Sequence, residues 1–525
     1  MLRLYSLGFG ENIYLGMRPW TRASLSHMLE ETGADIQDAN GSPAAEEAEG
    51  IYEALTRFLQ YDTEGPCLAY KGNTRVESIY TSMRGISGTP LRDSYHLGST
   101  IINDYGRPYE NGFNNYSGAS GYASAGRFLL YVRGEFRGAP SAAGYSTALA
   151  QRLSNDDGIP FINPLTNQPY NQAVTPLGPI GTTTNGRFIE AYVSAQVLNH
   201  VISFGKQDDW LGPGLGGAFA YSNNAENIYS FRINRIEPLY VPLLSRLTGP
   251  FRYDFLVGSL KGHTYPNSPW VHVEKISFRP TENLEFGFER TVIWGGKGHV
   301  PITIHSFLKS FFSFQNVPSS EKFSRNDPGA RFGSFDASYR LPYLRNWLTF
   351  YTDGEVHDDV SPIDAPRRAS WRPGLYLSHV PGIPKLDIRA EAAMTDPSVS
   401  TSQGGHFMYY EVIQRQGYTN QGQLFGDWIG REDKGGQAWV TYHLSGNEWL
   451  QVGMRNQKAA KDFIPGGTTL NDINFQAVKR IGKNFEIKGD FTVEHWKAPI
   501  YLPGQQTVTS TNILFTWYPK RKVSF

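Results

Sequence analysis

Hydrophobic and polar residues alternate one by one along Phe485–Glu494. One set of alternate positions is apolar or glycine: Phe485, Ile487, Gly489, Phe491 and Val493. The other set is polar or charged: Glu486, Lys488, Asp490, Thr492 and Glu494. Side chains of a β-strand point to opposite faces in turn, so this stretch predicts a strand with one apolar and one charged face. Charges on an inner face do not suit a packed soluble core, but they do suit a membrane barrel that is wet inside.

The same alternation recurs along most of the chain after Arg75, for example in Ile189–Val197, Leu284–Glu289 and Thr511–Trp517. We count between about sixteen and twenty such strands, and even strand numbers in bacterial barrels favour about eighteen. A soluble antiparallel sheet with one wet face is the alternative. No set of strands is apolar on both faces, which favours a closed antiparallel transmembrane β-barrel.

The first seventy residues follow a helical pattern instead. Thr21–Glu31 has apolar residues at helical spacing, with Thr21 as a candidate N-cap and Gly33 just past the expected end. A second helix is expected from Ser42, its N-cap, through an apolar stripe that ends at Leu59. We therefore expect two regions: a small N-terminal periplasmic helical bundle or plug over residues 1–70, and the barrel over residues 71–525.

Composition adds three constraints. Basic and acidic residues both number 49, so the chain shows no charge footprint of a nucleic-acid-binding protein. Aromatic residues make up 14%, which suits the aromatic girdles of a membrane barrel. The single cysteine, Cys67, excludes an intrachain disulfide. The start of the chain lacks the apolar stretch of a secretory signal, so a signal peptide is expected upstream.

The segments between strands differ in length. Short ones, such as Pro280–Asn283 and Gly482–Asn484, predict periplasmic turns. Long ones, including Asp208–Glu226, Gly296–Gly329 and Gly417–Gly435, predict extracellular loops or loops that fold into the lumen. The glycines of the GPGLGG stretch that begins at Gly212 lack the strand and helix of a dinucleotide site, and they suit a tight loop that turns back into the barrel.

Aromatic residues interleaved with amides in two of these loops suit carbohydrate. Aromatic rings stack on the apolar faces of sugars, and planar polar side chains hydrogen-bond sugar hydroxyls. The candidates are Trp210, Asn223, Asn224, Tyr418, Asn420 and Trp428. Ordinary loop packing explains each of them equally well. We find no compact nucleophile–base pair and no multi-cysteine metal motif, so we expect neither catalysis nor a metal or other cofactor.

Three passages of the chain resemble the capsule assembly Wzi family of Gram-negative outer membrane proteins: Phe204–Asn227, Phe278–His299 and Gly417–Gly422. The resemblance runs from about Leu15 to the C-terminus. It implies an eighteen-stranded outer membrane barrel with a periplasmic helical bundle, and a lectin-like, non-catalytic role. The motifs of the family add Arg290 and Trp294 to the candidate polysaccharide-binding residues.

Two functions remain open at this point. The first is a barrel that binds capsular or other long-chain surface polysaccharide and helps to assemble or anchor it at the cell surface. The second is an outer membrane porin or substrate channel, for which the lumen charges would line a water path. The expected partners are the polysaccharide, outer membrane lipid with lipopolysaccharide, and the polysaccharide export machinery. We expect a monomer in the outer membrane, with no nucleic-acid partner.

Overall fold

The computed structural model describes residues 1–10, 12–39, 41–63, 72–91, 101–142, 147–158, 181–314, 317–357, 368–396, 408–519 and 522–524. Cys67 lies outside these residues. In the described part of the chain, no helix is both long and apolar enough to cross a membrane.

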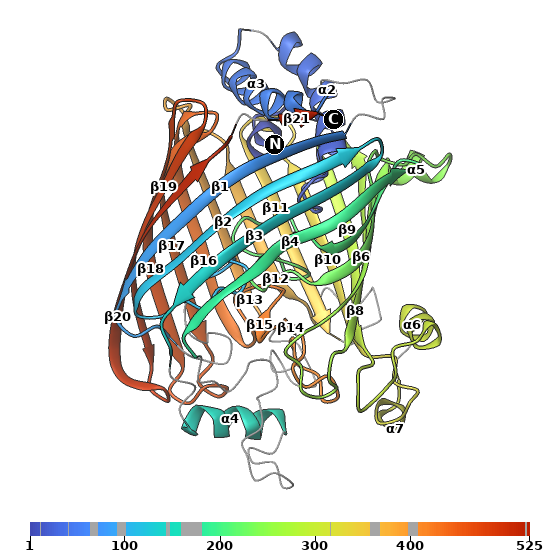
Figure 1. The fold of residues 1–525 in the computed structure, drawn as a ribbon, viewed down its shortest axis with the longest axis vertical. Helices are drawn as coiled ribbons and strands as arrows, with labels where there is room; N and C mark the ends of the chain where they lie inside the picture. The colour runs from blue at the N-terminus through green and yellow to red at the C-terminus, as the bar shows by residue number, and fades with distance from the viewer. Residues whose placement is uncertain are drawn as a thin grey trace.

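Within the described residues, eighteen antiparallel strands close into a single barrel, which confirms the strand number predicted from the alternation (Figure 1). Each strand pairs with its neighbour in the chain, and β20 pairs with β1 to close the circle. The strands are β1 (Gly72–Ser87), β2 (Gly112–Ala125), β3 (Phe128–Ala139), β4 (Thr183–Val197), β5 (His200–Lys206), β6 (Tyr229–Arg235), β7 (Phe251–Ser259), β8 (Trp270–Thr281), β9 (Leu284–Trp294), β10 (Ala330–Arg340), β11 (Leu348–His357), β12 (Ser370–Leu377), β13 (Leu386–Met394), β16 (Asp433–Ser445), β17 (Glu448–Ala459), β18 (Thr468–Ile481), β19 (Phe485–Ala498) and β20 (Leu502–Trp517).

Three short strands lie outside this circle. A small hairpin, β14 (Thr419–Asn420) with β15 (Gln423–Leu424), belongs to a loop. The last strand, β21 (Lys522–Ser524), pairs with the first residues of β1. It therefore continues along β1 from the point where the pairing of β1 with β20 ends.

The outer surface of the barrel is apolar, as the alternation predicts. In β19, Phe485 and Phe491 are exposed on the outside, whereas Glu494 is buried inside. The neighbouring strand repeats the pattern, since Ile473 and Phe475 are exposed and Asp472 is buried. An apolar outer belt around a polar interior is the arrangement that lipid requires of a membrane barrel.

The two ends of the barrel differ, and we call them the helical end and the loop end (Figure 1). The helical end carries α1 (Leu2–Ser6), α2 (Arg22–Asp38), α3 (Pro43–Thr63) and the short turns, including residues 282–283 and 482–484. The longest connections of the described chain lie at the loop end. One of them contains α4 (Thr147–Asp157), and another contains α6 (Ile304–Phe311) and α7 (Ser319–Lys322). One longer turn at the helical end holds α5 (Leu244–Thr248).

The N-terminal helices begin where the sequence predicts but end later. The Thr21 side chain accepts a hydrogen bond from the Ser24 backbone, and Ser42 caps α3 in the same way through Ala45. Gly33 does not end α2, which continues to Asp38. A Cβ atom at Gly33 would lie 2.7 Å from the Tyr52 hydroxyl, so this glycine allows close packing of α2 against α3.

Three segments fill one side of the barrel interior, and together we call them the plug: residues 13–20, 207–228 and 408–432. The N-terminal segment meets the β5–β6 loop in a two-residue bridge, with backbone hydrogen bonds of 3.0 and 2.7 Å between Arg18 and Trp210. The third segment packs against the second, since the Ser222 amide donates to the Phe425 carbonyl at 2.7 Å. The plug therefore connects segments from both ends of the barrel.

Candidate functional site

The plug has a hydrophobic core of its own against the inner wall. Phe219 and Phe425 of the plug are buried together with Val271 and Ile293, which point inward from β8 and β9. Tyr418 lies at the centre, stacked on Phe425 with 3.9 Å between ring centroids. This side of the barrel interior is therefore packed like the core of a soluble domain.

Buried ion pairs and hydrogen bonds hold the plug to the wall at β12 and β13. The guanidinium of Arg372 on β12 binds Glu391 at 2.8 Å and Asp427 of the plug at 2.5 Å, and all three side chains are fully buried. Glu391 also accepts hydrogen bonds from the backbone of Leu215 and Gly216. A Cβ atom at Gly217 would lie 2.3 Å from the Asp427 carboxylate, which explains a glycine at this point of the GPGLGG stretch.

The candidate residues of the β5–β6 loop hold the plug together. Trp210 is 9% exposed and donates from Nε1 to the Gly214 carbonyl at 3.1 Å. The backbone carbonyls of Asn223 and Asn224 accept from Tyr105 and Gly106 of the β1–β2 loop. The Asn224 side chain also donates to the Leu424 carbonyl at 3.0 Å. Asn223 and Asn224 thus connect loop to loop, whereas the Trp210 side chain binds within its own loop.

The candidates of the β13–β16 loop lie deeper still. Tyr418 is fully buried, and its hydroxyl donates to the Ala220 carbonyl. Asn420 donates to the Glu226 carbonyl at 2.8 Å and accepts from the Lys261 amide at 2.9 Å. Trp428 is 1% exposed and lies between two guanidinium groups, with Arg372 at 5.8 Å and Arg455 at 5.2 Å from its rings.

Arg290 and Trp294 are separated from the other candidates by the barrel wall. Both belong to the outward-facing positions of β9, in register with Glu274 and Trp270 of β8. The helix α6 covers them: Phe307 packs against Trp294 at 5.7 Å between rings, and Arg290 donates to backbone carbonyls at the C-terminal end of α6. Of the eight candidates, the structure brings six together in the plug and leaves these two outside.

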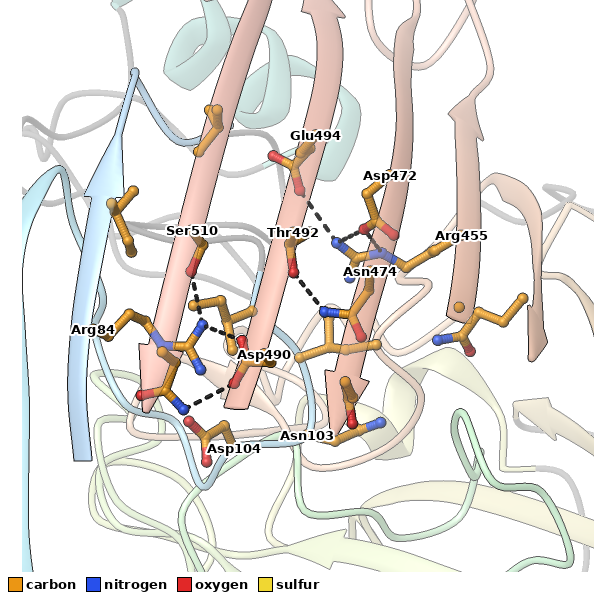
Figure 2. Close-up of a pocket in the computed structure, with 18 of the residues that line it drawn as sticks. Arg84, Asn103, Asp104, Arg455, Asp472, Asn474, Asp490, Thr492, Glu494 and Ser510 are labelled. Carbon is orange, nitrogen blue, oxygen red and sulfur yellow. Dashed lines mark hydrogen bonds and ion pairs between the residues drawn. The ribbon is translucent and has the colours of Figure 1, made fainter. Parts of the chain in front are cut away.

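The opposite side of the interior holds an open cavity of about 300 Å³ (Figure 2). Its wall is built by inward-facing side chains of β16–β20 and β1, and residues 101–104 of the β1–β2 loop close one side. Many of these wall residues are only half-buried, among them Trp439, Asn474 and Lys488. None of these three residues is among the sugar-binding candidates chosen from the sequence, although the alternation places Lys488 on the polar face of its strand.

The polar groups of the cavity form two ion-pair networks (Figure 2). Arg84 donates to Asp490 at 3.2 Å and to Ser510 at 2.8 Å, while Asn512 donates to the same carboxylate at 2.8 Å. A second network joins one guanidinium to two carboxylates, through contacts from Arg455 to Asp472 and Glu494. Between them, Asn474 donates to Thr492 at 2.7 Å. In both networks, lumen charges of opposite sign are paired with one another.

A further carboxylate, Asp104, lies in the loop at the edge of the cavity. Burial raises the pKa of this carboxyl, but the Arg107 guanidinium and the Tyr109 hydroxyl outweigh burial, so the net pKa is lowered. Asp104 is therefore an ionised acceptor at neutral pH. The cavity offers charged and amide groups around the half-exposed indole of Trp439, a combination that can accept and donate hydrogen bonds and stack on an apolar ring face.

A closed barrel with an apolar belt, a polar interior and long connections at one end is an integral membrane barrel of the outer membrane class. The family model of the capsule assembly protein Wzi matches residues 82–510, so the chain belongs to this family of outer membrane proteins.

Three known proteins align with the chain, two by structure and one by sequence. The structure of Wzi from Escherichia coli, described as a carbohydrate-binding β-barrel involved in group 1 capsule assembly, aligns with a TM-score of 0.65 and 16% identity, over 98% of this chain and 97% of that one. A 55.8 kDa protein of the cps region of Klebsiella pneumoniae is 26% identical over 172 residues, a third of each chain. The outer membrane protein OprD of Pseudomonas aeruginosa aligns at a TM-score of only 0.43, with 9% identity, over 87% of this chain and 94% of that one.

Proposed function

We propose that this protein binds a capsular or other long-chain surface polysaccharide and helps to assemble or anchor it at the cell surface, without catalysing a reaction. Membership of the capsule assembly family supports this role. The carbohydrate binding described for the Escherichia coli relative supports the choice of ligand. In this proposal the loop end faces the cell exterior and the helical end faces the periplasm, because short turns of outer membrane barrels lie on the periplasmic side.

The observation that carries the proposal is the composition of the open cavity. Asn474 and Gln476 present amides from β18, Asn512 presents one from β20, and Trp439 of β16 adds an aromatic side chain to the same lining. The volume lies at the lower limit of the range of about 300–1,000 Å³ for small-ligand sites, so it suits a short part of a glycan. We propose that this cavity and the loop rim beside it contact the sugar.

The eight residues chosen from the sequence have a different part in this proposal. Six of them lie in the plug and would affect binding indirectly, because they fix the loops that border the cavity. These six are Trp210, Asn223, Asn224, Tyr418, Asn420 and Trp428. Trp428 lies at the boundary, because its rings contact both Arg372 of the plug side and Arg455 of the cavity. Arg290 and Trp294 would act by fixing α6 outside the barrel.

Titration of the purified full-length protein with capsular polysaccharide of its source strain, followed by calorimetry, tests the proposal. Trp439→Ala should weaken binding about tenfold, as removal of an aromatic anchor does in other interfaces. Trp517→Ala is the matched control, since Trp517 is exposed on the lipid-facing surface, and it should leave affinity unchanged. No binding by the parent protein would refute the function, whereas equal binding by both variants would refute only the cavity as the site.

A porin is the second candidate, and the open cavity is the observation that favours it, because it leaves part of the lumen unfilled. Planar-bilayer recording separates the two functions. The polysaccharide-binding proposal expects the intact protein to show no large stable conductance, since the plug occupies the other side of the interior. Large ohmic currents from the parent protein would favour the porin.

A further inference from the structure

The outer surface of β8 and β9 carries charged residues at positions where a membrane barrel normally presents apolar ones. His272, Glu274 and Arg290 all point outward, since they alternate with the inward-facing Val273 and Thr291. Nearer the helical end, the outward residues of the same wall become apolar, and Ile276 and Phe288 are 39% and 54% exposed. Charged groups facing acyl chains are costly, so this cluster requires a cover.

The helix α6 supplies this cover from outside the barrel, beside the loop-end part of β8 (Figure 1). Phe307 and Phe311 of α6 pack against Phe255 of β7 at 6.4 and 6.3 Å between ring centroids. Arg290 donates to the carbonyls of Ser310 and Ser313 at 3.0 and 2.6 Å, so it neutralises the C-terminal end of the helix dipole. The helix is thus fastened to the wall.

A buried chain of hydrogen bonds between β8 and α6 also holds the helix to the wall. His272 contacts Glu274 through Nδ1 at 2.5 Å and Ser310 of α6 through Nε2 at 3.0 Å. The same three residue types form hydrolase triads, but here Ser310 and His272 are both fully buried. The Ser310 hydroxyl also donates to the Phe307 carbonyl at 2.8 Å, within its own helix. Its position indicates an anchor between helix and strand.

The remaining surface of α6 is divided into two sectors. Ile304, Leu308 and Phe312 follow one another at four-residue spacing and are 80%, 45% and 63% exposed. His305 and Lys309 occupy the adjacent sector, about 100° further around the helix. An exposed apolar sector beside a polar one is the pattern of a helix that lies in a membrane interface.

We propose that α6 is an interfacial helix that inserts Ile304, Leu308 and Phe312 among the acyl chains of the outer leaflet. The apolar sector lies on the same outer wall as the exposed Ile276 and Phe288, so the lipid-facing belt of the barrel continues onto the helix. Lipid is therefore the occupant that the surroundings favour over a second protein. The helix screens the charged cluster of β8 and β9 and widens the contact of the barrel with lipid on this side.

Spin labelling of the full-length protein in phosphatidylcholine vesicles tests this proposal. Cys67 is first replaced by serine, which leaves no other cysteine in the chain. A nitroxide is then attached in separate variants at Leu308→Cys, Ile304→Cys and the matched control Lys309→Cys, which lies one residue away on the polar sector. Power-saturation measurements compare collisions with oxygen, which concentrates in lipid, and with a water-soluble nickel complex.

The expected result is a several-fold higher ratio of oxygen to nickel collisions at positions 304 and 308 than at 309. Equal ratios at 308 and 309 would overturn the proposal, because the two sectors would then lie in the same environment, whether water or lipid. Suppressed collisions with both reagents at 304 and 308 would also overturn it, because a protein surface would cover the helix. Two independent apolar positions guard against a label that disturbs the helix locally.

Discussion

The wall alternates in the same way on both sides of the barrel interior, but the inward-facing side chains are buried to different extents on the two sides. From β5 to β13 the plug covers these side chains, and Asp353 and Arg372, which both bind plug residues, are buried. From β16 to β20 the wall surrounds an open cavity, and Gln476 and Lys488 are half-buried. The difference arises from the loops, since the wall pattern is the same on both sides. The loops thus decide which part of the lumen is packed like a core and which part stays open.

This difference changes what a charged pair contributes. On the plug side a pair such as Arg372 with Asp427 has lost its water, so each charge depends on its partner. On the open side, a partly exposed pair such as Arg480 with Glu486 stays in contact with water, so water can solvate either ion after its partner is removed, and the pair contributes little. The same chemistry should therefore have a large effect on one side and a small effect on the other. Each prediction below tests this contrast.

The largest effect is expected for Arg372→Met. The substitution leaves Glu391 and Asp427 buried without their shared cation, which should lower the free energy of unfolding by about 3–5 kcal/mol. Urea unfolding followed by tryptophan fluorescence measures the change. Arg480→Met is the matched control on the open side, where the pair of Arg480 with Glu486 is partly exposed, and it should cost less than about 1 kcal/mol. Similar losses in both variants would contradict the contrast.

The next effect concerns His263, in the β7–β8 loop at the edge of the plug. Burial lowers the pKa of this imidazole to about 4, against the opposing effect of its hydrogen bond to the Thr419 carbonyl. In the unfolded chain this imidazole is protonated below about pH 6.5, whereas in the folded protein it stays neutral down to about pH 4. Stability is therefore fully present above pH 6.5 and falls as the pH drops toward 4, by about 2 kcal/mol at pH 5.

Comparison with His263→Gln isolates this contribution, because glutamine retains a donor for the Thr419 carbonyl but does not titrate. Unfolding free energies at pH 7 and pH 5 give the measurement for both proteins. The parent protein should lose about 2 kcal/mol more than the variant on acidification. Equal losses would show that His263 is not held neutral by the plug.

The barrel could be predicted from the sequence because period-two alternation is a local signal. Phe491 and Asp490 fall on opposite faces whatever the rest of the chain does. The plug could not be predicted in this way. The Leu215 amide donates to Glu391, a residue 176 positions later in the chain, and no local sequence pattern predicts such a contact. Loops rich in aromatic and amide residues suit sugar binding and plug packing equally, so composition could not separate these roles for Trp210 or Tyr418.

Two further features of the structure could be predicted from the sequence alone. The polar residues His272, Glu274 and Arg290 occupy outward positions of strands whose other outward residues are apolar, and this break in the pattern marks the wall that α6 covers. Trp439 stands among polar neighbours on the inward face of its strand. The sequence does not reveal the end of α2, because a glycine such as Gly33 is typical of a helix end, whereas here it allows close packing against Tyr52.

The smallest effect comes from asparagine at matched inward positions of the two sides. Asn234 on the plug side donates to Asp254 at 2.7 Å and accepts from Arg252 at 3.3 Å, and it is 4% exposed. Its replacement by alanine leaves buried charged groups short of partners and should cost about 1.5 kcal/mol. Asn474→Ala on the open side removes one hydrogen bond to Thr492, which water in the cavity can replace, and should cost about 0.5 kcal/mol.

Urea midpoints of the two asparagine variants give this comparison without any change of charge. If the loops control burial, the loss should be greater for Asn234→Ala, and combining it with Arg372→Met should give nearly additive losses, since the two residues share no hydrogen-bond partner among those described. A greater loss for Asn474→Ala would mean that the open wall is not solvated. The cavity would then be a packed part of the barrel, and its amides would be unavailable to a sugar.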